Sequence, residues 1–193
     1  MTHKNTRLLY QKIIGLAGSI PEASLDKLFG LINYKQIAKG DYILNQGQIC
    51  CNIVFVEKGL LRSFIVKEGI VINTGFTIEN NFTTNLKSLR SSLPSDVSIQ
   101  AGEDSAIYEF PRDALFSLYK ESPEIESFGR KLLEQLLMEQ EEHTNLFKIY
   151  TPAERYQFMQ KNKPEITQRV SLTQLASYLG VARETLSRIR KLK

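Results

Sequence analysis

Residues 171–193 carry an apolar pattern that fits two short helices joined by a tight turn. Ser171 and Gln174 have the spacing of a capping box, which starts the first helix. Gly180 stands at the turn, where a positive φ is cheap only for glycine. Ala182 departs from the pattern because it offers no side-chain oxygen to cap the second helix. The apolar positions recur at helical spacing and form the inner faces of both helices: Leu172, Leu175, Leu179, Val181, Leu186 and Ile189.

The outward face of the second helix carries side chains that suit duplex DNA. Arginine can bond two acceptors of guanine, and glutamate can accept from cytosine. Lysine and arginine also suit phosphate oxygens. The alternative is a pair of structural helices with a solvated charged face, but the match to a helix-turn-helix favours DNA as a partner. The predicted outward-facing residues are Arg183, Glu184, Ser187, Arg188, Lys191 and Lys193, with Arg190 beside them as a phosphate contact.

Positive charge is concentrated at the same end of the chain. The formal net charge of the whole chain is +4. Residues 151–193 hold nine Lys/Arg and three Asp/Glu, a net charge of +6, whereas residues 1–150 hold sixteen and eighteen, a net charge of −2. Neutralising phosphates requires positive charge beside the DNA-contacting helix. The division of charge therefore supports a nucleic-acid partner for residues 151–193.

Between about residues 36 and 111, short β-branched and aromatic runs alternate with turn residues. Many short strands at regular spacing indicate an antiparallel barrel or a double-sheet roll. Residues 7–36 are predicted to be helical in part, with Pro21 opening the second piece. The strands are predicted within residues 42–44, 53–56, 60–66, 70–72, 97–99 and 106–110.

A long helix is predicted to follow a short one at residues 112–120. Ser122 and Pro123 begin it, and it extends through about residue 148. A long apolar stripe beside a small roll suits a coiled-coil seam between two copies of the chain, with burial against its own roll as the alternative. His143 is predicted to be a polar spacer in that seam. The stripe consists of Ile125, Phe128, Leu132, Leu133, Leu136 and Leu137.

These elements divide the chain into three parts and place it in the α+β class. Residues 1–120 form a β-roll sensor domain with flanking helices, and residues 121–150 form the long dimerisation helix. Residues 151–193 form a helix-turn-helix domain of winged-helix type, opened by an N-cap and proline at Thr151 and Pro152. A hydrophobic fraction of 42% and a charged fraction of 24% are ordinary for a globular protein.

In this order of elements and in four sequence stretches, the chain resembles the cyclic-AMP receptor protein and fumarate–nitrate regulator (Crp-Fnr) superfamily. The resemblance covers most of the chain and implies a homodimeric transcription regulator that works with the transcription machinery. It also implies a roll that senses a ligand or redox state, and a two-fold DNA operator. The stretches are Lys39–Gly47, Val54–Gly59, Thr151–Tyr156 and, most specific, Tyr178–Arg190.

The resemblance assigns roles to individual residues. The Arg-Glu-Thr-x-x-Arg pattern places the base-reading positions of the family at Arg183, Glu184 and Arg188. Ser187 matches a further base contact of the fumarate–nitrate branch. Ser171 and Thr173 fall where family members contact phosphate. Many members continue past the recognition helix into a hairpin wing, so here either the wing is absent or strands near residues 167–170 replace it.

One departure from the family concerns cyclic nucleotides. Members that bind them have a Gly-Glu pair and then an arginine, followed by Ser or Thr, that holds the cyclic phosphate. Here Glu79 follows Ile78, residues 91–98 contain no arginine, and Asp96 would repel a phosphate. A buried phosphodiester without a cationic partner is costly. The sequence therefore predicts that cyclic AMP does not bind.

A roll that binds a small molecule, with weak or vestigial DNA binding, is the second hypothesis. No cofactor is predicted, but an unknown small-molecule effector fits this hypothesis and the first. The adjacent Cys50 and Cys51 exclude the family's iron–sulfur sensor, and in a strand one should be buried and the other exposed. A vicinal disulfide or thiol sensor is the alternative for this pair. The candidate pocket, otherwise a solvated loop, is Glu79, Asn80, Asn81, Thr83 and Thr84, followed by Asn85.

An enzyme is the least supported class. The only histidines, His3 and His143, lie outside the roll, so a metal-binding catalytic roll lacks its ligands. No Ser-His-Asp set, Walker loop or CxxC pair occurs. The chain also lacks an eighteen-residue apolar run and a signal peptide, which predicts a cytoplasmic protein with no membrane partner.

Overall fold

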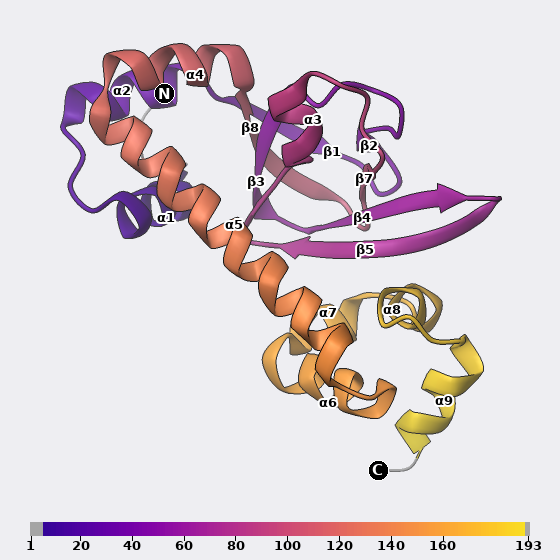
Figure 1. Ribbon diagram of the computed structural model, residues 1–193. Helices are drawn as coiled ribbons and strands as arrows, with labels where there is room; N and C mark the ends of the chain where they lie inside the picture. The colour runs from indigo at the N-terminus through magenta and orange to yellow at the C-terminus, as the bar shows by residue number, and fades with distance from the viewer. Residues whose placement is uncertain (1–5, 192–193) are drawn as a thin grey trace.

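The computed structural model describes residues 6–191 and contains a β-roll, a long helix and a C-terminal group of helices (Figure 1). The roll consists of two four-stranded antiparallel sheets, with strand orders β1-β8-β3-β6 and β2-β7-β4-β5. This confirms the predicted double-sheet roll and the α+β class. The strands are β1 (Asn33–Ile37), β2 (Tyr42–Leu44), β3 (Asn52–Lys58), β4 (Leu60–Lys67), β5 (Ile70–Ile78), β6 (Phe82–Thr83), β7 (Ser98–Ala101) and β8 (Ser105–Pro111).

Helices lie before, within and after the roll. Helices α1, α2 and α4 pack against the roll, and α5 runs from the roll to the C-terminal helices (Figure 1). Ser122 caps α5 by accepting a hydrogen bond from the backbone N–H of Ile125 at 3.4 Å. The helices are α1 (Arg7–Ala17), α2 (Glu22–Leu31), α3 (Leu86–Ser91), α4 (Arg112–Glu121), α5 (Pro123–Ile149), α6 (Pro152–Asn162), α7 (Pro164–Arg169), α8 (Leu172–Tyr178) and α9 (Arg183–Lys191).

Residues 7–36 are helical in part, as predicted, and one alternative for the C-terminal end was wrong. Residues 33–36 belong to β1, which pairs with β8 along its whole length. Residues 167–170 form no strand that could stand in for a wing, since Pro164 opens a helix that continues to Arg169. All regular elements described between residues 151 and 191 are helical. The sequence patterns also missed α3 and β6, which are too short to show a period.

The main core fills the space between the sheets and extends to α1, α2, α4 and the first half of α5. Aromatic rings link these layers. Phe82 in β6 lies 5.0 Å from Phe55, 5.8 Å from Phe110 and 6.1 Å from Phe128, measured between ring centroids. Since Phe128 belongs to α5, the long helix is anchored in the core of the roll.

The apolar stripe of α5 is divided between two environments. Ile125, Phe128 and Leu132 are buried in the core of the roll, which was the alternative to a dimer seam for these positions. Leu136 packs against the same core. Leu133 and Leu137 remain 38% and 57% exposed. The surface that α5 could offer to a second copy is therefore narrower than the sequence predicted.

His143 does not lie in that exposed seam, contrary to prediction. Its ring lies 5.0 Å from the ring of Phe147 and 5.2 Å from that of Tyr178, so it packs between α5 and α8. Cys50 is buried and Cys51 is exposed, as predicted, although both precede β3 and lie outside a strand. Within residues 6–191, none of the helices is both long enough and apolar enough to cross a membrane. His3 and Lys193 lie outside the described residues.

Candidate functional site

Helices α8 and α9 form a helix-turn-helix whose predicted local signals are confirmed. The backbone N–H of Gln174 donates to Ser171 Oγ at 3.2 Å, and the Ser171 N–H donates to Gln174 Oε1 at 3.0 Å. This reciprocal pair is the predicted capping box. Gly180 takes a φ of 67° at the turn. The predicted inner residues Leu175, Leu179 and Leu186 are buried together.

Contacts from neighbouring helices fix the turn. Arg155 in α6 donates from Nη1 to the carbonyl of Leu179 at 2.8 Å, and its guanidinium lies 4.6 Å from the ring of Phe147. A side chain at Gly180 would approach Phe147 to 3.2 Å, which leaves little room there for any larger residue. Sequence reasoning missed Arg155, because its partner lies in another helix and no local pattern marks it.

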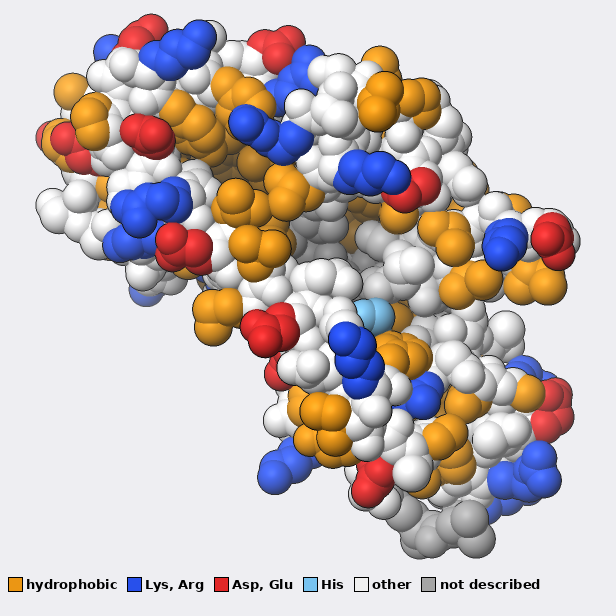
Figure 2. Space-filling view, in the orientation of Figure 1, with side chains coloured by type: hydrophobic (Ala, Val, Ile, Leu, Met, Phe, Trp, Pro, Cys, Tyr) orange, Lys and Arg blue, Asp and Glu red, His pale blue; other side chains and the backbone are white. Residues whose placement is uncertain are grey.

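The outer surface of α9 is open and charged. Arg183, Glu184, Arg188, Arg190 and Lys191 are exposed. Within residues 6–191 none of these five side chains forms an ion pair. Ser187 is half-buried, while Ser171 and Thr173 at the start of α8 are exposed. Figure 2 shows Lys and Arg side chains, with acidic ones beside them, over this lower-right end of the molecule. The predicted base and phosphate contacts therefore share one accessible surface.

The helix-turn-helix is docked against the edge of the roll. The edge strand β5 offers unpaired backbone groups, and Ser177 in α8 uses two of them. The backbone N–H of Asn73 donates to Ser177 Oγ at 3.0 Å, and that hydroxyl donates to the carbonyl of Val71 at 3.2 Å. The ring of Phe76 meets the ring of Tyr178 edge-on at 5.3 Å. Strand β5 therefore contributes to the core of the C-terminal helices.

A groove of about 450 Å³ separates the tip of β5 from the helix-turn-helix. Its roll side is formed by Ile70, Val71 and Ile72, and its opposite side includes Thr173 and Arg183. Both residues of the second side are predicted DNA contacts. The tip of the β4–β5 hairpin thus lies next to part of the candidate DNA surface.

An ion-pair cluster, here called the Arg169 clamp, joins α7 to the roll. Arg169 donates to Glu79 Oε2 at 2.7 Å and to Glu79 Oε1 at 2.9 Å. It also donates to Glu103 Oε1 at 2.6 Å. Glu79 accepts a further bond of 2.7 Å from the Gly59 N–H. The bidentate geometry is the strong form of an arginine–carboxylate pair.

The clamp alters the protonation of its members. Burial alone would raise the pKa of Glu79, but hydrogen bonds from Arg169 and Gly59 outweigh it and hold that pKa below its ordinary value. The hydrogen bonds to Glu79 and Glu103 raise the pKa of Arg169. Glu79 and Arg169 are therefore both charged at neutral pH, and the attraction between the roll and α7 through this pair is fully present there.

The residues predicted to line a ligand pocket have separate roles. Glu79 belongs to the clamp, and Asn80 takes a φ of 62° in the turn after β5. The amide of Asn81 donates to the Glu79 carbonyl at 2.9 Å. Thr83 is buried in β6, and the hydroxyl of Thr84 donates to the carbonyl of Asn52 at 3.0 Å. Asn81 and Thr84 border two different cavities, so the five do not converge on one site.

The resemblance aligns residues 91–98 with the family's phosphate-binding stretch. In this chain the acidic side chain of that segment bonds to neighbouring residues. Asp96 accepts from the amide of Asn85 at 3.1 Å and from Lys87 Nζ at 3.4 Å. The hydrogen bond from Asn85, with that from Lys87, lowers the pKa of Asp96. Arg90 in α3 extends away from this segment, over the ring of Phe116 in α4 at 5.1 Å. The one carboxylate of residues 91–98, that of Asp96, is thus engaged with Asn85 and Lys87.

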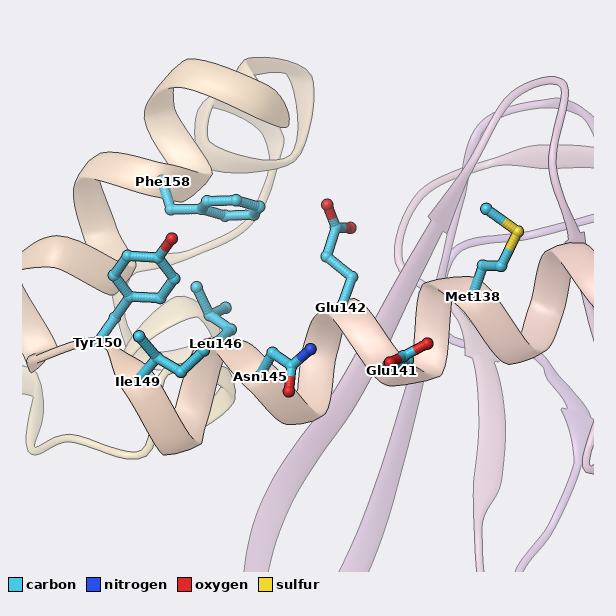
Figure 3. Close-up of a pocket in the computed structure, with 8 residues that line it drawn as sticks. All are labelled: Met138, Glu141, Glu142, Asn145, Leu146, Ile149, Tyr150 and Phe158. Carbon is cyan, nitrogen blue, oxygen red and sulfur yellow. The ribbon is translucent and has the colours of Figure 1, made fainter.

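A further groove of about 410 Å³ lies where α5 meets α6 (Figure 3). Tyr150 and Phe158 stand at one end of it, with ring centroids 6.1 Å apart, and Met138 stands at the other. Glu141 and Glu142 lie between them, and Glu142 faces Lys163 Nζ at 3.6 Å. In the described part of the chain, no three His, Cys, Asp or Glu side chains are placed to hold a metal ion.

Comparison with known proteins places this geometry in context. Residues 34–122 match the family model named cyclic nucleotide-binding domain. No curated protein matches the sequence significantly. A chain from Eubacterium rectale assigned to the crp/fnr family of transcriptional regulators is 16% identical with a TM-score of 0.71, over 93% of this chain and 86% of that one.

Two further solved structures share the fold. FixK2 from Bradyrhizobium japonicum is 19% identical with a TM-score of 0.67, over 83% of each chain. The catabolite activator protein of Thermus thermophilus is 18% identical with a TM-score of 0.57, over 94% of this chain and 85% of its own. At these identities the likeness concerns the fold, which extends through the roll, the long helix and the C-terminal helices.

Proposed function

Because residues 34–122 form a cyclic nucleotide-binding domain and the chain has the fold of the Crp/Fnr transcription regulators, we propose that it is a sequence-specific DNA-binding transcription regulator. It acts as a homodimer on a pseudo-palindromic operator, together with the transcription machinery. Residues 1–120 are its sensor, residues 121–150 its dimerisation helix and residues 151–193 its DNA-binding domain. The roll senses a small-molecule effector other than cyclic AMP.

The exposed surface of α9 is the observation that carries the proposal. Glu184 and Arg188 stand one turn apart, as do Arg183 and Ser187, so all four reach one side of the helix. Since the charged members form no ion pairs in the described part of the chain, they are free to bond base edges. Arg190 and Lys191, in the last turn, suit phosphates.

The homodimer is supported by α5. Leu133 and Leu137 are one turn apart and exposed, while the opposite side of the helix is buried in the roll. Pairing two copies of α5 would cover these side chains and relate the recognition helices by a two-fold axis. Such dimers place their recognition helices about one DNA turn apart, roughly 34 Å. The operator should therefore be a pseudo-palindrome.

The proposed effector differs from cyclic AMP on electrostatic grounds. Asp96 stands in the stretch where cyclic-nucleotide-binding relatives hold the phosphate, and Arg90 points away from it. The Asp96 carboxylate, although exposed, would repel a phosphodiester bound beside it. Titration of the purified protein with cyclic AMP should show no binding, and micromolar affinity would contradict this part of the proposal.

The experiment that tests the regulator is selection of bound sequences from a random duplex pool. The wild-type protein should recover a two-fold motif. Arg188→Ala should cost about 1–3 kcal/mol on that motif and relax the preference at one symmetric pair of positions. Lys191→Ala, the matched control, should weaken binding on all sequences alike.

Two outcomes would contradict the proposal. Equal effects of both variants on every sequence would remove the base-reading role of Arg188. Weak, sequence-blind binding by the wild type, together with a small molecule retained on purification, would favour a ligand-binding roll with vestigial DNA binding.

A further inference from the structure

A cavity of about 320 Å³ lies outside the roll, where α3, α4 and α5 meet beside β3. Of the five residues at which the sequence placed a ligand pocket, Thr84 alone lines it. Its volume is at the lower end of the range of small-molecule sites, about 300–1,000 Å³. Its walls are mainly apolar and include Leu86, Leu89, Phe116, Leu132, Leu133 and Leu136.

Two hydrogen-bond donors border the cavity without a partner. The Arg90 guanidinium lies over the Phe116 ring, and no carboxylate described in residues 6–191 pairs with it. The Tyr119 hydroxyl likewise has no hydrogen-bond partner in the described part of the chain. Burial raises the pKa of Tyr119 to about 12, so at neutral pH this hydroxyl keeps its proton and can donate it.

The position of Tyr119 is fixed by the helix opposite. Its hydroxyl lies against Gly129 in α5, where an added Cβ would collide with the phenol oxygen. Its ring lies 5.7 Å from that of Phe116. Contacts from α4 and α5 therefore hold the exposed Arg90 and the half-buried Tyr119 at the same apolar cavity, and no acceptor in the described part of the chain bonds to either.

The charges at the rim favour an anion. Arg90 and Arg130 line the cavity together with one carboxylate, Glu126. Arg130 is partly engaged, since its Nη1 lies 3.7 Å from Glu134 Oε1. Arg90 is the guanidinium without a counter-ion, and a desolvated carboxylate beside it would gain a charge-assisted pair.

We propose that this cavity binds a small amphipathic carboxylate, with its alkyl body against the leucines and its carboxylate accepting from Arg90 and Tyr119. At roughly 30 Å³ for each water-sized group, the cavity holds about ten such groups. A saturated chain of eight carbons matches this size. Binding would bury the alkyl chain and satisfy both unpartnered donors in one step.

The inference that an occupant of this cavity acts as an effector rests on the proposed function. Leu132, Leu133 and Leu136 belong to α5, and Leu137 beside them is part of the proposed dimer surface. An occupant would therefore contact the helix that links the sensor to its partner and to the DNA-binding domain. The binding of a carboxylate itself depends on neither dimerisation nor DNA.

The test is calorimetric titration of the full chain with octanoate, and with octan-1-ol as the uncharged control. Octanoate should bind saturably with one site per chain, and octan-1-ol at least tenfold more weakly. Arg90→Gln should weaken octanoate binding by about tenfold or more, and Tyr119→Phe by about threefold. Arg7→Gln, which removes an exposed arginine of α1, should leave the affinity unchanged.

Three results would overturn the site: no saturable binding of octanoate, equal affinity for octan-1-ol, or unchanged affinity in Arg90→Gln. Circular dichroism of each variant checks that the fold is retained. Octanoate binding with no change in affinity for the selected DNA motif would contradict the effector role alone. Failure to recover any DNA motif, with octanoate binding intact, would contradict the regulator and leave the site standing.

Discussion

The interior of the roll and its junction with the C-terminal helices are held by different forces. The roll is stabilised by apolar side chains from two sheets and from helices α1 to α5, with Phe55, Phe110 and Phe128 almost completely buried. The junction is smaller and combines polar contacts with apolar packing of β5 on the C-terminal core. It consists of the Arg169 clamp, the hydrogen bonds of Ser177 to β5 and the Phe76–Tyr178 contact.

Because of this difference, the interior of the roll resists rearrangement, whereas the junction can rearrange more easily. A closely packed apolar core resists rearrangement because moving its side chains exposes apolar surface to water. Charged and hydroxyl contacts at a partly exposed junction can be exchanged for water at small cost. The junction is therefore the natural place for the C-terminal helices to move relative to the roll, and a moving element of this kind is what coupling between two sites requires.

The largest effect is expected where the roll and α5 share a core. Phe128→Ala should lower the free energy of unfolding by about 3–5 kcal/mol, because it leaves a cavity among Phe82 and its neighbours. Guanidinium denaturation measures the change. Leu93→Ala, at an exposed apolar site, is the control and should cost less than about 0.5 kcal/mol. Similar losses for both would remove the distinction between interior and surface.

A smaller effect is expected on the other side of the same helix. Leu137→Ser removes an apolar side chain from each copy at the proposed seam, and should weaken dimerisation by about 2–3 kcal/mol. The unfolding of the monomer should hardly change, because this leucine is exposed. Sedimentation equilibrium at several concentrations gives the dissociation constant. An unchanged constant would place the dimer contact elsewhere.

Breaking the Arg169 clamp should have a smaller effect on stability, and that effect should be confined to the junction. Arg169→Gln leaves Glu79 and Glu103 without their cation, and should weaken docking of the C-terminal helices by about 1–2 kcal/mol. Amide hydrogen exchange at Asn73, whose N–H bonds Ser177, should then accelerate, while exchange within β3 stays slow. Arg62→Gln, which breaks a pair of hydrogen bonds to Gln100 inside the roll, is the matched control. Equal acceleration in both variants would contradict a separate junction.

The smallest effect is a pH dependence at the same junction. Burial, with the nearby charge of Lys163, lowers the pKa of His143. The folded state therefore favours the neutral ring, and its contribution to stability is present above the ordinary pKa of about 6.5 and lost as pH falls through the lowered value. Glu142 and Tyr178 are the other titratable groups near this ring.

The measurement is hydrogen exchange in α8 between neutral and mildly acidic pH. Exchange should accelerate on acidification in the wild type, and less so in His143→Phe, which keeps a ring against Tyr178 but cannot titrate. The Arg169 clamp should not contribute to the pH dependence of exchange between neutral and mildly acidic pH. Because the pKa of Glu79 is lowered, its contribution is lost only as pH falls from about 4.3 downward. An identical slope in wild type and variant would assign the effect to another group.

The helix-turn-helix could be read from the sequence because its signals are local. A capping box, a turn glycine and an apolar period each depend on residues within a few positions of one another. The capping box at Ser171 forms as the spacing indicated, and Thr151 caps α6 as predicted, in a capping box with Glu154. The strands of the roll were also located, with the exception of β1 and β6.

The candidate sensor region could not be read in the same way. Glu79 looked like a pocket residue in a polar loop, yet its partner Arg169 lies 90 positions away. The cavity beside Arg90 is assembled from α3, α4 and α5, and α3 carried no recognisable period. Ion pairs and cavities between distant segments depend on the packing of those segments, which periodicity does not encode.

The sequence by itself determined the order of elements, the double-sheet roll and the face of α9 that meets solvent. Tertiary structure decided which side of α5 is buried, since a stripe of leucines suits a core and a seam equally well. It also decided that β5 packs on α8 and that Arg169 joins α7 to the roll. The physical reason is the separation along the chain. Helices and strands form from patterns among nearby residues, whereas burial and charge pairing between distant residues determine how these elements pack together.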